Sequence, residues 1–214
     1  MFDRAATAII KPGVDRLARL LVGSGVNANQ MTWLGFGLGI AAAVLVAVGK
    51  FQVAALVVLA SRLCDALDGA MARQTQVTDA GGFLDIALDF LFYASMPLAF
   101  ALADPPANAL PAAVLLAAFI GTMSSFLAFA VMAAKRNMRN LAYPDKSFYF
   151  LGGLTEATET LAFMLAMCVW PQQFATLAYL FAALCAITMA TRSWWGWRAF
   201  SQAPVRHPET GPNP

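Results

Sequence analysis

Four aspartates stand in two close pairs within a largely apolar part of the chain. Asp65 and Asp68 are three residues apart, and Asp85 and Asp89 are four residues apart. Either spacing places both carboxylates of a pair on one face of a helix. Acidic side chains within long apolar segments are costly and are usually functional. These four side chains are therefore the first candidates for a functional site.

Carboxylates that gather in one place repel one another unless cations neutralise them. Only Arg62 and Arg73 lie close to the two pairs in the sequence, so basic side chains are too few for this. Hard divalent cations prefer oxygen ligands, which makes Mg²⁺ or Mn²⁺ the natural partner, and two such ions would balance four negative charges. The alternative is a structural role, in which acids at helix ends pair with basic neighbours or with water.

The residues after the first pair favour a phosphate ligand. Gly69 and Ala72 lie on or beside the face of Asp65 and Asp68, and their small size would let a ligand approach the backbone. Arg73 follows, and a guanidinium can bind phosphate oxygens through two parallel hydrogen bonds. Carboxylates, metal ions and an arginine together predict a diphosphate site. Close packing of two helices would explain the two small residues equally well.

The elements that carry these residues are predicted to be membrane-spanning helices. The chain has 214 residues, of which 60% are hydrophobic and 12% charged, against about 25% charged residues in soluble domains. A helix needs about 20 mostly apolar residues to cross a bilayer, and only helices satisfy the backbone there at this length. The fold class is therefore all-α, with six spans at approximately 31–48, 52–70, 82–103, 110–134, 148–170 and 174–191.

The basic residues predict the orientation of these spans. Lysine and arginine gather before the first span, after the second, between the fourth and fifth, and after the sixth, whereas the alternate connections hold only Lys50. Because basic residues favour the cytosolic side, both termini and the acidic site should face the cytosol of a cytoplasmic membrane.

The two ends of the chain differ in character. Residues 1–24 carry apolar side chains at helical spacing with basic ones between them, as in an amphipathic helix lying on the cytosolic leaflet. An amphipathic helix packed on the bundle would show the same pattern. No continuous apolar segment with a cleavage site occurs there, so we expect no removable signal peptide. Residues 25–200 would form the six-helix catalytic domain, and residues 201–214, rich in proline and polar residues, a disordered cytosolic tail.

Segments 65–73 and 81–89 together closely resemble the signature of the CDP-alcohol phosphotransferases, D-x2-D-G-x2-A-R-x8-G-x3-D-x3-D. Every specified residue type is present. One departure exists, because seven residues separate Arg73 from Gly81 where the signature has eight. A shorter resemblance lies at Asn29 and Thr32, which are similar to the N-x-x-T of the same family.

The resemblance implies that a substituted phosphoryl group passes from a CDP-linked alcohol to a second alcohol, with release of CMP. The implied ligands of two divalent ions are Asp65, Asp68, Asp85 and Asp89. Asp89 would also be the general base. The implied contacts to the CDP moiety are Asp65, Asp68, Gly69, Ala72 and Arg73. A homodimer is expected from the resemblance alone, and nothing in the sequence favours nucleic acid as a partner.

The membrane setting favours a lipid donor, most simply CDP-diacylglycerol, whereas the acceptor alcohol stays open. The candidates for acceptor binding are Lys135, Arg139, Lys146, Glu156, Glu159 and Arg192. The basic ones could bind a phosphorylated polyol, although the positive-inside rule alone would place them there. The two glutamates should face the bundle interior, where they could bind a polyol or an amine, or pair with a buried base.

Two other classes of protein also use intramembrane acids. A cation transporter could hold four carboxylates, but it would be expected to carry them at mid-membrane in discontinuous helices. An intramembrane aspartyl protease needs only two facing aspartates. The position of the four acids toward one face, beside Gly69 and Arg73, argues against both.

Overall fold

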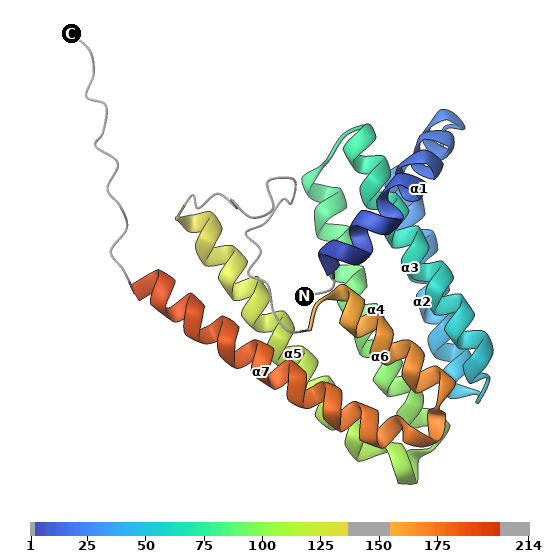
Figure 1. Ribbon diagram of the computed structural model, residues 1–214, viewed down its shortest axis with the longest axis vertical. Coiled ribbons are helices and arrows are strands. Elements are labelled where there is room, and N and C mark those ends of the chain that lie inside the picture. Colours follow the sequence, from blue (N-terminus) through green and yellow to red (C-terminus); the bar gives the residue numbers. More distant parts are fainter. Residues whose placement is uncertain (1–2, 137–154, 202–214) are drawn as a thin grey trace.

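The computed structural model describes residues 3–136 and 155–201, and within these ranges every regular element is helical. The prediction of an all-α protein is therefore confirmed (Figure 1). The elements are α1 (Asp3–Gly23), α2 (Ala28–Ala47), α3 (Phe51–Gln74), α4 (Asp79–Ala103), α5 (Pro105–Lys135), α6 (Ala157–Val169), the short 3₁₀ helix η1 (Pro171–Gln173) and α7 (Phe174–Ser201).

Each predicted span overlaps one of the helices α2 to α7. Four of these, α2, α4, α5 and α7, are long and apolar enough to cross a membrane, which makes this an integral membrane protein. Helix α3 has 24 residues but carries the charged residues of the acidic site, and α6 has 13 described residues. The first part of the fifth predicted span, at 148–154, and the tail from residue 202 lie outside the described residues.

Side-chain caps fix where α2 and α4 begin. Asn27 and Gln30 form a reciprocal capping box at the start of α2, with hydrogen bonds of 2.9 and 3.1 Å. At the start of α4, the Thr78 hydroxyl accepts a hydrogen bond of 3.1 Å from the backbone N–H of Gly81. The caps hold the first turns of these two helices in place, and these turns border the site described below.

Small residues let α2 lie close against α3 and α4. A Cβ atom at Gly39 would lie 2.5 Å from Cδ2 of Phe92, a side chain of α4 that is fully buried. A Cβ atom at Gly35 would lie 3.1 Å from Cβ of Cys64 on α3. Glycine at both positions therefore permits an approach that a larger residue would prevent, as is common between helices in membranes.

Aromatic rings pack together at the end of the bundle away from the aspartates. Phe100 of α4 stacks on Phe51 of α3 at a centroid distance of 5.7 Å and on Phe174 of α7 at 4.3 Å. Phe100 and Phe174 are almost fully buried. This stack belongs to the main apolar core, so the end of the molecule away from the aspartates is held by packing.

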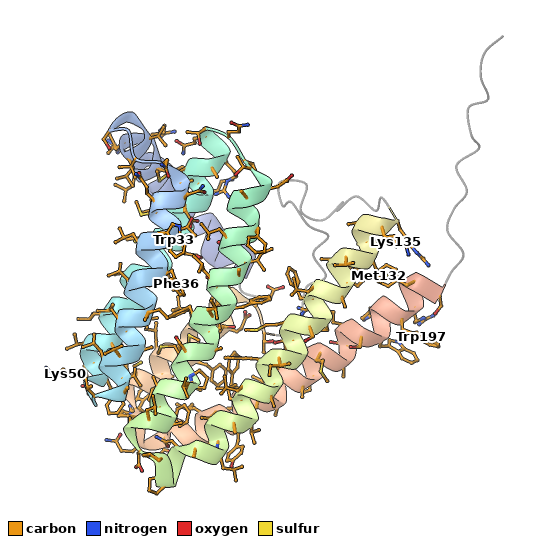
Figure 2. All side chains as sticks on the ribbon, turned by 180° about the vertical axis from the view of Figure 1, so that it is seen from behind. Trp33, Phe36, Lys50, Met132, Lys135 and Trp197 are labelled. Atoms are coloured by element: carbon orange, nitrogen blue, oxygen red, sulfur yellow. The ribbon has the colours of Figure 1, made fainter. Side chains whose placement is uncertain are left out.

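Helices α5 and α7 form a pair that leans away from the other helices toward its C-terminal end (Figure 1). A Cβ atom at Gly121 would lie 2.5 Å from the sulfur of Met189, so the two helices cross closely there. At the end of the pair, Arg136 donates to the carbonyl oxygens of Ala199 and Phe200 at 3.2 and 2.5 Å. Lys135 and Trp197 therefore lie at the same end of the pair, as Figure 2 shows.

Helix α1 packs against the part of α3 that carries the aspartates. Ala18 is fully buried in a small apolar cluster with Leu67, Ala70 and Met71 of α3. On the same helix Leu20 is exposed. Helix α1 therefore packs on α3 in the described part, while the prediction of an amphipathic helix on the cytosolic leaflet stays a prediction.

Candidate active site

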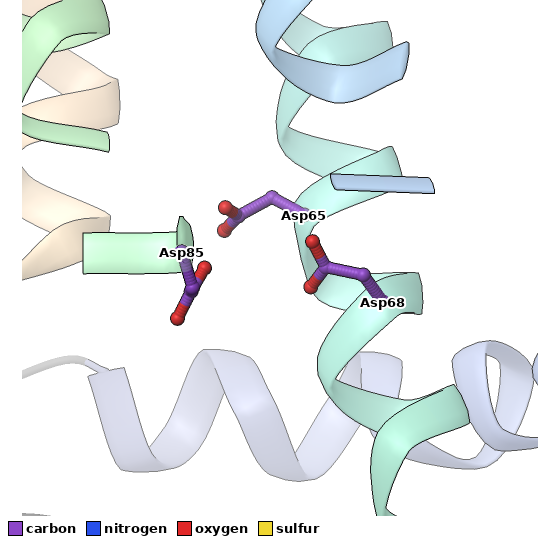
Figure 3. Close-up of side chains that lie close together, drawn as sticks. All are labelled: Asp65, Asp68 and Asp85. Atoms are coloured by element: carbon purple, nitrogen blue, oxygen red, sulfur yellow. The ribbon is translucent and has the colours of Figure 1, made fainter. Parts of the chain in front are cut away.

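Three of the four aspartates meet between α3 and α4. One carboxylate oxygen from each of Asp65, Asp68 and Asp85 lies within 4.8 Å of the other two. Figure 3 shows the two side chains of α3 pointing toward Asp85 of α4. The prediction that the two acidic faces would meet holds for these three residues. We call them the carboxylate cluster.

The carboxylate cluster fits a divalent cation. Asp68 is only 5% exposed, and its Oδ2 atom is buried without a hydrogen-bond partner among the described residues. A buried charged oxygen is costly unless a partner compensates it. Three carboxylates that converge on one point supply the hard oxygen ligands that Mg²⁺ and Mn²⁺ prefer.

The fourth aspartate is held by an arginine. Nη1 of Arg62 lies 2.7 Å from Oδ1 of Asp89 and 3.4 Å from Oδ1 of Asp65. In the sequence, Arg62 was noted only as a base near the two aspartate pairs, and no role was predicted for it. Its position three residues before Asp65, on the same helix face, was the signal that could have found it.

A cavity of about 410 Å³ opens beside the carboxylate cluster. It brings together most of the residues predicted to bind metal or donor, and four helices contribute to its wall. Its lining includes Asn29, Thr32, Asp68, Gly69, Ala72, Arg73, Gly81, Asp85, Asp89 and Phe126. Asp65 lines a second, smaller space of about 10 Å³ with Thr32, Arg62 and Asp89.

Gly69 faces this cavity. A Cβ atom there would have only one neighbour within 4 Å among the described residues, the Nη1 atom of Arg73 at 3.4 Å. No neighbouring helix packs against Gly69 at that distance in the described part of the chain. The geometry therefore favours ligand approach over helix packing as the reason for glycine at this position.

Part of the cavity wall comes from the shorter of the two sequence resemblances. Asn29 and Thr32 of α2 both line the cavity. A Cβ atom at Gly81 would lie 3.1 Å from the Thr78 hydroxyl and 3.3 Å from Oδ1 of Asn29, so glycine fits where this wall meets α4. The connection before Gly81 is one residue shorter than in the signature, yet Asp85 still reaches the carboxylate cluster.

Among the candidates for acceptor binding, Glu156 at the start of α6 lies close enough to Arg192 of α7 for their charges to interact. Arg192 is buried in α7, where it donates to the Thr122 carbonyl at 2.9 Å and lies 5.8 Å from the ring centroid of Phe126. Because Phe126 lines the cavity, Arg192 stands directly behind that wall. Lys135 is exposed at the end of α5.

The remaining acceptor candidates are Glu156, Glu159, Arg139 and Lys146. Glu156 and Glu159 form a capping box at the start of α6, and the backbone N–H of Glu156 donates to Glu159 at 3.2 Å. Both glutamates are half-buried. Arg139 and Lys146 lie outside the described residues.

Known proteins resemble this chain in sequence. Residues 26–197 match the CDP-alcohol phosphatidyltransferase family. The inner membrane protein YnjF of Escherichia coli is 50% identical over 197 residues, which are 92% of this chain and 96% of that protein. The archaetidylinositol phosphate synthase of Pyrococcus horikoshii is 34% identical over 94 residues, which are 44% of this chain and 50% of that protein.

Solved structures share the fold. The phosphatidylinositol phosphate synthase PgsA1 of Mycobacterium tuberculosis, solved with CDP-DAG bound, has a TM-score of 0.63 and 24% identity over 86% of this chain and 93% of its own. The structure of PgsA1 in complex with manganese and citrate also has a TM-score of 0.63 and 24% identity, and the match covers 86% of this chain and 88% of that one. Since the family match runs from α2 into α7 and includes the aspartates gathered here, the chain belongs to the CDP-alcohol phosphatidyltransferase family.

Proposed function

We propose that the protein transfers a phosphatidyl group from CDP-diacylglycerol to a hydroxyl of an acceptor alcohol and releases CMP. The observation that carries this proposal is that three aspartates, Arg73 and Gly69 line a single cavity. The CDP-DAG complex of the related fold supports a lipid donor.

The metal would be held first by Asp65, Asp68 and Asp85, with Asp89 completing a second position. The close approach of the three carboxylates and the unpaired Oδ2 atom of Asp68 support this assignment. Divalent ions bound there would neutralise the diphosphate and stabilise the charge that develops on the leaving CMP. The manganese complex of the related fold agrees with Mg²⁺ or Mn²⁺ in this role.

The donor diphosphate would lie between the carboxylate cluster and Arg73. The Arg73 guanidinium borders the cavity next to Gly69, so it can bind phosphate oxygens where the backbone of α3 is accessible. The first turns of α2 and α4 also line this cavity, and helix N-termini favour negative charge. Ala72 and Asp68 complete the proposed contact surface for CDP.

Asp89 is proposed as the general base. It would accept the proton of the acceptor hydroxyl while that oxygen forms a bond to the phosphorus that bears the diacylglycerol. The bond from this phosphorus to the bridging oxygen breaks, and the bridging oxygen leaves with CMP. Asp89 lines the cavity one helical turn beyond Asp85, which supports this role.

The acceptor would enter from the side of Phe126. Arg192 contacts this ring, and the Phe126 side chain would have to move before the guanidinium could reach an acceptor in the cavity. A phosphorylated polyol is the acceptor class that such a cation favours. Lys135, Arg139, Lys146, Glu156 and Glu159 remain proposed contributors to this side.

The proposed membrane arrangement has six spans, α2 to α7, with both termini and the site on the cytosolic side. The basic residues beside the spans support this orientation. Residues 1–24 would lie on the cytosolic leaflet, residues 25–200 would form the catalytic domain, and the tail 201–214 would be cytosolic. A homodimer is proposed from the family alone.

The test is release of CMP from CDP-diacylglycerol by the purified protein in detergent, with Mg²⁺ or Mn²⁺ and a panel of acceptor alcohols. We expect release only with metal and with a subset of acceptors, and at least about 100-fold less with Asp89→Asn. A protein that binds Mn²⁺ but releases no CMP with any CDP-alcohol would contradict the proposal.

The alternative is a cation transporter that uses the same acids. A liposome assay separates the two, because a transporter would move Mn²⁺ or protons across the bilayer without any CDP-alcohol. We expect no such flux, since Arg62 already occupies part of the acidic site.

A further inference from the structure

Arg62 stands inside the acidic site as a built-in positive charge. Its side chain is 12% exposed, and its Nη1 atom lies 2.7 Å from Asp89 and 3.4 Å from Asp65. The guanidinium therefore links α3 and α4, because it contacts both Asp65 of the carboxylate cluster and Asp89, the proposed base. Arg62 has no role in the transfer reaction proposed above.

Neighbouring groups hold the guanidinium at this position. Its central carbon lies 4.3 Å from the ring centroid of Phe92 and 5.7 Å from that of Tyr93. Nη2 donates to the hydroxyl of Ser61 at 3.2 Å, and this hydroxyl donates to the Gly35 carbonyl at 2.7 Å. Stacking from α4 and hydrogen bonding toward α2 thus fix an arginine that α3 supplies.

We propose that Arg62 is a positioning residue that makes the two metal positions unequal. It directs Asp89 through a charge-assisted hydrogen bond and takes part of the neutralising role of the second ion. The chain would then bind one divalent ion tightly at Asp65, Asp68 and Asp85, and a second ion weakly beside Asp89. This inference rests on the proposed metal site and adds a residue to it.

The charges of the site support this inequality. Among the described residues, the four carboxylates and the guanidinium of Arg62, which contacts two of them, together carry three negative charges, and one divalent ion reduces these to a single one. A second ion would reverse the sign of this net charge beside the buried side chains of Arg62 and Asp68, which is unfavourable because water screens charges less well there. Without Arg62, two ions would bring the same site to neutrality. Removal of the arginine should therefore strengthen the binding of the second ion.

The experiment measures Mn²⁺ binding to the full-length protein in detergent by calorimetry and by electron paramagnetic resonance. Wild type should bind one Mn²⁺ tightly and a second at least about ten-fold more weakly. Arg62→Gln should tighten the second site by about ten-fold or more. Lys50→Gln is the matched control, because it removes one positive charge from the opposite end of the same bundle (Figure 2) and should leave both affinities unchanged.

Two further variants separate charge from position. In Arg62→Gln combined with Asp89→Asn, the gain at the second site should disappear, because the ligand freed by the first change is lost. Arg62→Lys keeps the charge and loses the paired geometry, so it should bind Mn²⁺ as wild type does while CMP release falls about ten-fold or more.

The outcomes test the metal site and the role of Arg62 separately. A wild type that binds no Mn²⁺ would overturn the proposed metal site itself. Equal tight affinities for two ions in wild type, or an unchanged second site in Arg62→Gln, would overturn the role of Arg62 and leave the metal site intact. If Arg62→Gln does not fold, then Arg62→Lys decides, and full turnover in that variant would contradict the positioning role.

Discussion

At the scale of single residues, the four aspartates differ in burial and in their partners. Asp68 is almost inaccessible and has an oxygen without a hydrogen-bond partner in the described structure, whereas Asp85 is exposed and Asp89 is held by Arg62. Among the proposed metal ligands, Asp68 is therefore the one whose charge most needs a metal ion, and loss of this charge should lower the metal affinity first.

Asp68→Asn keeps the size of the side chain and removes its charge. We expect Mn²⁺ affinity to fall by at least about 10–100-fold, with a matching loss of turnover at limiting metal. Calorimetry in detergent measures the first effect and CMP release the second. Asp79→Asn is the control, since Asp79 is exposed in the first turn of α4 outside the carboxylate cluster. Equal Mn²⁺ affinity in both variants would remove Asp68 from the metal site.

Asp89→Asn separates the base from the ligand. Asparagine keeps one oxygen donor but cannot accept the proton at neutral pH, so the rate should fall by about 10²–10⁴-fold while much of the donor affinity remains. The measurement pairs donor binding with CMP release at saturating substrates. Turnover within a few-fold of wild type would show that another group takes the proton.

Arg73→Lys tests the proposed phosphate contact. Lysine keeps the charge but not the planar fork, so we expect about ten-fold weaker binding of the CDP donor and an unchanged melting temperature, because Arg73 is exposed. Arg198→Lys, at an exposed position near the end of α7, is the matched control. If both variants bind the donor as wild type does, Arg73 is a surface residue.

Residue types and spacings were enough to predict the carboxylate cluster, because a helical repeat determines which side chains share a face. They did not assign Arg62. Whether an arginine points to solvent or into a site depends on its neighbours, and here Phe92 of α4 and Ser61 of α3 hold it inward. Those contacts require the packed helices, so the sequence alone gave only the three-residue spacing from Asp65.

At the scale of the helices, a stripe of glycines on α2 sets how closely the site can be assembled. Gly35 contacts α3 and Gly39 contacts Phe92 of α4, so α2 spaces the two helices that carry the aspartates. The sequence predicted the helices themselves well, because long apolar segments have few alternatives in a bilayer. It placed their ends less well, and α5 begins at Pro105, before the predicted start at residue 110.

Gly39→Ala should destabilise this arrangement. A Cβ atom there would lie 2.5 Å from the buried Phe92 ring, and overpacking of this kind costs about 1–3 kcal/mol. We expect a lower melting temperature in detergent and reduced turnover, since Phe92 also stacks on Arg62. Gly37→Ala is the control two residues earlier on α2, where nothing lies within 4 Å in the described structure. A melting temperature equal to or above that of this control would refute the packing argument.

At the scale of the whole molecule, the outer surface is apolar and the polar chemistry lies at one end. Large apolar side chains are exposed along several helices, among them Leu34, Val44, Ile120 and Leu180. As a member of its family, the protein is a membrane transferase of phospholipid synthesis with lipid as its surrounding solvent. The sequence predicted this class from composition, whereas the lean of α5 and α7 depends on side-chain contacts that composition does not encode.

The orientation of the molecule can be tested on a single helix. Pro106 and Lys135 are exposed near the two ends of α5, so a cysteine at each should react on opposite sides of the membrane. We expect Lys135→Cys to be labelled from the cytosol and Pro106→Cys from outside, in a background where Cys64, Cys168 and Cys185 are serine. The reverse pattern of labelling would invert the proposed topology.

The ion pair between Arg62 and Asp89 also bears on how the protein enters the membrane. The two residues belong to adjacent helices joined by a short connection, so they can meet as soon as this helical hairpin forms. A single charged side chain in an inserting helix costs up to about 2.5–3.5 kcal/mol, the value for the helix centre, and pairing reduces that cost before any metal is bound. In the proposed six-span arrangement this hairpin could therefore be inserted during synthesis without divalent ions, and metal loading would be a later step of maturation.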